Sequence, residues 1–142
     1  MNDKKISQEM VSEEMERMSG KLSQKELNKD LDVIVSSKRK INSKSEYLKT
    51  LKFPMLFNQV KLAFEMINDY RSKAYRDLPW KTITLLTVAF LYFINPFDLI
   101  PDFIPIIGYG DDALAFAGVL KAVQSDLKKY CTWKGYDAAK YF

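Results

Sequence analysis

The sequence predicts an all-α fold: a small helical bundle in which a long amphipathic helix packs on a short hydrophobic helical hairpin joined by a proline-rich loop. Three observations support this prediction. Apolar residues recur at helical spacing over 53–78, no segment shows the alternation of a half-buried strand, and the chain has only five Gly and five Pro. We divide the chain into a charged, helical N-terminal extension at 1–50 and a helical domain at 51–142.

The N-terminal extension contains two signals for the start of a helix. Ser23 and Glu26 have the spacing of a capping box, and Ser43 and Glu46 repeat that spacing. Between the two signals, we interpret residues 36–40 as a helix end followed by a connector.

The segment 53–78 carries the strongest amphipathic pattern of the chain. Its apolar stripe consists of Phe53, Phe57, Val60, Phe64, Ile67, Tyr70, Ala74 and Leu78. Spacings of three and four residues predict one continuous helix, which Pro79 and the residue before it should end. We expect the stripe to pack in the core; a face for a partner helix or a membrane surface is the alternative.

The 39 residues of segment 82–120 contain no Lys or Arg, although the chain has 22 of these bases elsewhere. Within the segment we expect one helix over about 80–94 and another over about 112–130. The uncharged run 82–94 is thirteen residues long, which is short of the roughly 20 residues that a transmembrane helix needs. Neither predicted helix therefore spans a bilayer alone.

Two arrangements of this segment remain open. In a membrane hairpin, the two helices enter the bilayer from one side, with basic flanks in the cytoplasm and Trp80 at the interface. In a soluble bundle, the same helices form the apolar centre and the 53–78 helix covers them. Short helices, threonines and buried acids favour the bundle, whereas the absence of bases favours the membrane.

The loop between these helices has a specific pattern. It reads Asn95-Pro-Phe-Asp98-Leu-Ile-Pro101-Asp102-Phe-Ile-Pro105-Ile-Ile-Gly108-Tyr-Gly-Asp111-Asp112. This string closely resembles the signature of the YkvA-like family, a domain of unknown function, with Gly110 standing where relatives more often have an aliphatic residue. The resemblance covers roughly 70–125 and implies a small, mostly bacterial protein, often described as membrane-associated, with no assigned activity.

The four acids of this segment are the candidate ligand site. Asp98, Asp102, Asp111 and Asp112 could converge on a divalent cation such as Mg²⁺ or Ca²⁺, which oxygen ligands favour. In that case metal-bound water could support hydrolysis. The alternative is structural, because acids also cap helix starts and accept backbone hydrogen bonds in turns. We assign the structural positions of the signature to Asn95, Pro96, Pro101, Pro105 and Gly108.

The basic run is the second candidate site. Lys38, Arg39 and Lys40 could contact anionic lipid at about 1 kcal/mol each, or they could belong to a solvated connector. We do not expect nucleic-acid binding, because no convincing stacking platform accompanies these bases.

The composition excludes several classes of function. The chain has no His and a single Cys131, which excludes histidine catalysis and an intramolecular disulfide and leaves a poor ligand set for zinc. No apolar stretch follows the first residues, so we expect no cleavable secretion signal. We predict a non-enzymatic module without a cofactor, cytoplasmic or at the inner face of the membrane, whose partner is a membrane surface or a helix.

Overall fold

The computed structural model describes residues 13, 15–50, 54–94 and 111–142, and within these ranges the side chains of 47–50, 54 and 111–115 are not described. Regular structure in the described ranges is helical, which confirms the all-α prediction. The principal elements are α2 (Gln24–Ser36), α3 (Lys38–Thr50), α4 (Pro54–Arg71), α5 (Trp80–Ile94), α7 (Asp111–Ala122), α8 (Gln124–Lys134) and the 3₁₀ helix η2 (Ala138–Lys140).

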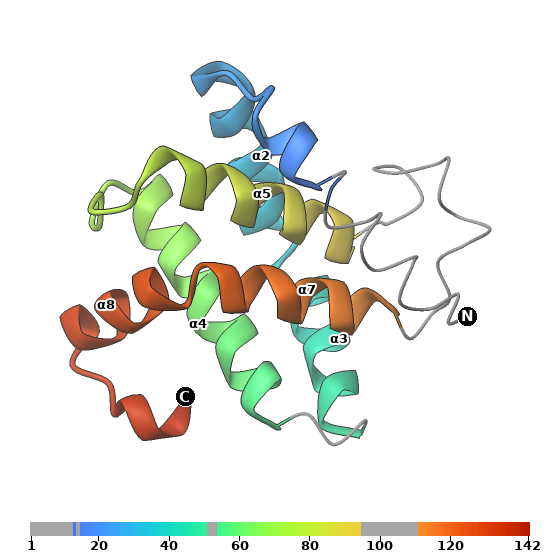
Figure 1. Ribbon diagram of the computed structural model, residues 1–142, viewed down its shortest axis with the longest axis vertical. Helices are drawn as coiled ribbons and strands as arrows, with labels where there is room; N and C mark the ends of the chain where they lie inside the picture. The colour runs from blue at the N-terminus through green and yellow to red at the C-terminus, as the bar shows by residue number, and fades with distance from the viewer. Residues whose placement is uncertain (1–12, 14, 51–53, 95–110) are drawn as a thin grey trace.

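The central element is α5, which lies between α2 and α7 and also contacts α3 and α4 (Figure 1). From Thr82 to Ile94, every residue of α5 except Leu91 is buried. The uncharged run is therefore enclosed by other helices, as in the bundle arrangement, and α7 packs along it as the second arm of the predicted hairpin. In the described ranges, no helix combines the length and the apolar character that crossing a bilayer requires.

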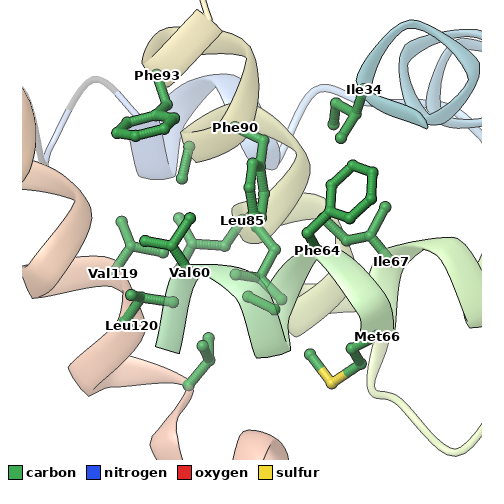
Figure 2. Close-up of a cluster of buried hydrophobic side chains, with 14 of the residues drawn as sticks. Ile34, Val60, Phe64, Met66, Ile67, Leu85, Phe90, Phe93, Val119 and Leu120 are labelled. Carbon is green, nitrogen blue, oxygen red and sulfur yellow. The ribbon is translucent and has the colours of Figure 1, made fainter. Parts of the chain in front are cut away.

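The hydrophobic core joins α5 to α2, α4 and α7. Figure 2 shows Ile34 of α2, Phe64 of α4, Phe90 of α5 and Leu120 of α7 gathered in one cluster. The Phe90 ring meets the Phe116 ring of α7 edge to face, with centroids 4.9 Å apart. Aromatic pairs in this geometry contribute about 0.5–1.5 kcal/mol beyond their buried area, so they help to fix α7 on α5.

Three threonines of α5 lie in this apolar core without leaving an unpaired hydroxyl. The Thr84 and Thr87 hydroxyls donate to the backbone oxygens of Trp80 and Ile83, at 2.9 and 2.7 Å. The Thr82 hydroxyl donates to a carboxylate oxygen of Asp126 at 2.6 Å. Burial of these polar side chains is tolerated because each one has an acceptor.

The long amphipathic helix ends earlier than the sequence predicts. Instead of reaching the residues before Pro79, α4 stops at Arg71, and Lys73 adopts the left-handed conformation with φ of 70°. The Ala74 N–H donates to the Asp69 oxygen at 2.9 Å and closes the helix end. The turn frees the next residues to leave the helix axis and reach α8. The predicted stripe is buried from Phe57 to Tyr70, Ala74 is exposed, and Phe53 lies outside the described residues.

The predicted helix at 112–130 is instead two helices. α7 begins at Asp111 and ends at Ala122, and α8 starts at Gln124, with Val123 between them at φ of −105° and ψ of 15°. The break has a packing reason, because α7 lies along α5 whereas α8 turns to lie along α4. The sequence could not indicate this change of direction, since both helices continue one apolar stripe.

The predicted connector at 36–40 is also wrong, because Ser37 alone separates α2 from α3. The Ser37 N–H donates to the Ile34 oxygen, and the Ile41 N–H donates to the Ser37 oxygen, both at 3.0 Å. Ile41 is buried, so tertiary packing holds the basic run in helical form. The predicted start at Ser43 consequently lies inside α3. The predicted cap at Ser23 is confirmed, since its hydroxyl oxygen accepts from the Glu26 N–H at 3.2 Å.

Candidate functional site: an edge with two exposed tryptophans

Most of the signature lies outside the described residues. This applies to Asp98 and Asp102, and also to Asn95, Pro96, Pro101, Pro105 and Gly108. Asp111 and Asp112 form the first turn of α7, but their side chains are not described. The convergence of the four acids on Mg²⁺ or Ca²⁺ therefore stays a prediction. Among the described residues, no group of three or more His, Cys, Asp or Glu could hold a metal ion.

The basic run of the second candidate site is accessible. Lys38, Arg39 and Lys40 form the first turn of α3, and all three are exposed. Lys38 and Arg39 line a shallow depression on α3, together with Asn42, Ser43 and Glu46. Contact of this run with lipid stays a prediction.

A surface that the sequence pattern only partly indicates lies where the connection between α4 and α5 meets α8. An ion pair, a hydrogen bond and ring contacts join the two segments. Asp77 pairs with the Lys129 ammonium at 2.8 Å, Thr82 donates to Asp126, and the Tyr75 ring lies 4.8 Å from the Trp133 ring. These contacts hold residues 75–82 alongside residues 126–133, at the end of the molecule where α5 begins (Figure 1).

Each of these segments exposes a tryptophan. Trp80 is 43% exposed and Trp133 is 52% exposed, which makes them two of the four exposed large apolar side chains in the described ranges. We call the surface formed by residues 73–82 and 126–133 the tryptophan edge. Its sequence contains five bases and two acids. Two exposed apolar rings on segments with an excess of bases make this edge a candidate interaction surface.

Under the edge, Tyr130 fixes α8 to α4. Its hydroxyl donates to the Asp69 carboxylate, and the Lys134 ammonium lies 3.1 Å from the same carboxylate. Burial and the hydrogen bond to Asp69 both raise the pKa of Tyr130 well above its usual range. The phenol therefore stays protonated, and this neutral donor anchors α8 so that Trp133 is presented on a rigid helix.

Tyr75 supplies the other support. Its side chain is 5% exposed, and its ring packs edge to face against Tyr130 with centroids 4.9 Å apart. Its hydroxyl is buried and has no hydrogen-bond partner in the described part of the chain. Burial, and secondarily the charge of Asp77, raise the pKa of Tyr75. Leaving the buried Tyr75 hydroxyl unpaired costs about 1–3 kcal/mol. The packing of the Tyr75 ring against Tyr130 and Trp133 must therefore contribute more than this cost.

Sequence reasoning placed Trp80 at an interface but did not single out Trp133 or Tyr75. The lysines on either side of Trp133 were the only feature of the sequence that could have indicated an interaction surface there. The pairing of Trp133 with the residues after α4 depends on the early end of that helix, which the periodic pattern did not show.

The chain has relatives without an assigned activity. Residues 82–118 match the model of a family described as protein of unknown function (DUF1232). Over 71 residues, the chain is 37% identical to the uncharacterized membrane protein YkvA of Bacillus subtilis (strain 168), covering 50% of this chain and 67% of that protein. No solved structure matches.

Proposed function

This chain belongs to the YkvA-like family of proteins of unknown function, and on that premise we propose that it is a non-enzymatic helical module that attaches to an anionic membrane surface through the tryptophan edge. The observation that carries the proposal is the exposure of Trp80 and Trp133 on two segments that are bonded together. A location at the cytoplasmic face of the membrane agrees with the excess of bases on this edge.

Because α5 is buried, we place the membrane contact on the exposed tryptophan edge and not on the α5–α7 hairpin. Because α2, α4 and α7 cover α5, its apolar side chains are already satisfied by protein contacts. Exposed tryptophans are suited to the boundary between headgroups and acyl chains, where the ring is partly buried and the indole N–H still finds an acceptor. The name of the Bacillus subtilis relative, a membrane protein, agrees with such a role.

The charges of the edge add a long-range attraction. Lys73 and Lys81 are exposed, whereas Lys129 is engaged with Asp77 and Arg76 lies over the Tyr70 ring, 4.0 Å from its centroid. Each unpaired base near an anionic surface contributes about 1 kcal/mol, and added salt weakens this contribution. The proposed attachment is therefore reversible and salt-sensitive, with tryptophan insertion supplying the part that salt does not remove.

Flotation with vesicles of phosphatidylglycerol and phosphatidylcholine tests the proposal. Replacing both tryptophans, W80S with W133S, should weaken vesicle binding roughly 10- to 100-fold, since each half-exposed ring contributes about 1 kcal/mol or somewhat more when buried. The control is the double variant V33S with M55S, which removes two further exposed apolar side chains of the described residues and should bind like the wild type. Equal losses in both variants, or no flotation of the wild type, would contradict the proposal.

Fluorescence gives a second measurement because the chain contains only two tryptophans. Their emission should shift to shorter wavelength on addition of anionic vesicles, and lipids brominated near the headgroup should quench it. In W80F the emission comes from Trp133 alone, and in W133F it comes from Trp80 alone, so the two rings are measured separately. Vesicle binding without any change in emission would show that another surface makes the contact.

A further inference from the structure

A groove lies on different elements from the tryptophan edge, between α3, α4 and the C-terminal segment 135–142. Its volume is about 400 Å³, within the usual range for small-molecule sites. The lining residues come from all three elements and are Lys38, Ile41, Asn42, Asn58, Lys61, Phe64, Glu65, Tyr136 and Tyr141.

The C-terminal wall of the groove is held by side chains of α4. The Asn58 amide donates to the Lys140 oxygen at 2.8 Å, and the Gln59 amide donates to the Tyr141 oxygen at 2.7 Å. The rings of Tyr136 and Tyr141 stack on each other, with centroids 6.0 Å apart and an interplanar angle of 22°. The wall is therefore preorganised and offers aromatic surface to a ligand.

The charges of the groove leave two ammonium groups available. Lys38 is exposed, and the Lys61 ammonium lies 4.6 Å from the centroid of the Phe57 ring, with no ion pair to an acid among the described residues. The acid of the lining, Glu65, already accepts a hydrogen bond from the Tyr136 hydroxyl at 2.9 Å. The groove thus combines two cations with one acid, which leaves an excess of positive charge among its lining residues.

Neutral donors accompany these cations. The Asn42 side chain lines both this groove and the neighbouring depression, which adds Arg39, Ser43 and Glu46. Burial, and then the charge of Glu65, raise the pKa of Tyr141, so its hydroxyl remains a proton donor. Ammonium, amide and hydroxyl donors in one concave site match an acceptor with several oxygens better than they match a cation or an apolar ligand.

We propose that this groove binds an organic phosphate, with the phosphate held by Lys38 and Lys61 and the organic part lying against Tyr136 and Tyr141. The phosphate could belong to a lipid headgroup or to a free phosphate ester, because the recognising chemistry is the same. The site is independent of the tryptophan edge and stands whether or not that edge contacts a membrane.

Titration of the full chain with glycerol 3-phosphate, followed by the amide signals in ¹⁵N-correlation spectra, tests the site. We expect saturable shifts at the Asn42 and Asn58 side-chain amides, with uncharged glycerol producing none. The variant K38M with K61M should bind at least 10-fold more weakly. The matched control, K25M with K29M, removes two exposed lysines of α2 and should bind like the wild type. Absent shifts in the wild type, or equal weakening in both variants, would overturn the proposal.

Vesicles distinguish the two sources of phosphate. If the natural ligand is a headgroup, K38M with K61M should reduce flotation with phosphatidylglycerol vesicles, and glycerol 3-phosphate should compete. If the ligand is a free ester, the variant should float like the wild type while losing its response to glycerol 3-phosphate. The variant W80S with W133S should retain that response in either case, and its loss there would overturn the separation of the two sites.

Discussion

Tyrosines with raised pKa values link the C-terminal part of the chain to α4. For Tyr130 and Tyr141 the first cause is burial, whereas for Tyr136 it is the hydrogen bond that its hydroxyl donates to Glu65. In each case the folded chain favours the protonated phenol. The contacts that present Trp133 and form the groove wall therefore depend on neutral tyrosines.

This dependence predicts a loss of stability in alkaline solution. A phenol in the unfolded chain ionises near its ordinary pKa of 10.0, whereas the folded chain retains the proton to higher pH. The stabilisation is therefore complete below about pH 10 and is lost as the pH rises further. Urea unfolding between pH 8 and 11 should show the decline.

The variant Y130F separates the contribution of this residue. It should lower the free energy of unfolding at pH 8 by about 1.5–3 kcal/mol, because a hydrogen bond to a charged acceptor is lost. It should also make the alkaline decline shallower, since one of the responsible groups is gone. A decline as steep as that of the wild type would show that Tyr130 does not contribute to it.

At the scale of elements, the end of α4 decides where the tryptophan edge forms. The periodic pattern continues to Leu78, yet the helix stops because Lys73 takes a left-handed conformation. That conformation costs a residue with a Cβ about 1 kcal/mol, whereas glycine adopts it freely. The cost is offset where the following segment packs Tyr75 against Tyr130 and Trp133.

Glycine at this position should therefore stabilise the protein. We expect K73G to raise the free energy of unfolding by about 0.5–1 kcal/mol relative to K73A, which removes the same charge but keeps the Cβ. Urea unfolding in the absence of lipid measures both variants. Equal stability of the two would mean that Lys73 does not adopt the left-handed conformation in solution.

At the scale of the whole molecule, α2 belongs to the same core as the helices that follow it. Leu27, Leu31 and Ile34 are each fully buried, and α2 contacts both α4 and α5. The division at residue 50, which rests on composition, stays a prediction. The shared core nevertheless implies that the two parts unfold together, because α2 buries its apolar face against α4 and α5 of the second part.

The variant L31A tests this cooperativity. It should lower the free energy of unfolding by about 2–5 kcal/mol, because a buried leucine is lost from the common core. Unfolding should still occur in a single transition. K29A alters an exposed residue of the same helix and should change stability by less than about 0.5 kcal/mol. Two separate transitions in urea, or a small effect of L31A, would show that α2 folds apart from the rest.

The sequence was sufficient for the features that depend on local pattern. Hydrophobic periodicity over 57–70 predicted a buried helix, and Ser23 with Glu26 predicted the start of α2, because side-chain spacing and capping act within a few residues. The uncharged run in α5 predicted a short apolar helix. The same run could not distinguish a bilayer from a protein core, since both offer an apolar environment.

Tertiary structure alone decided the features that depend on contacts between distant segments. It enclosed α5 within the bundle, held residues 38–40 in a helix through the burial of Ile41, and divided the predicted C-terminal helix at Val123. It also brought Trp133 beside Tyr75, which are 58 residues apart in the sequence. The physical reason is that these arrangements are stabilised by the burial of apolar surface between helices. A local sequence pattern shows that a helix has an apolar face, but it does not specify which other helix packs against that face.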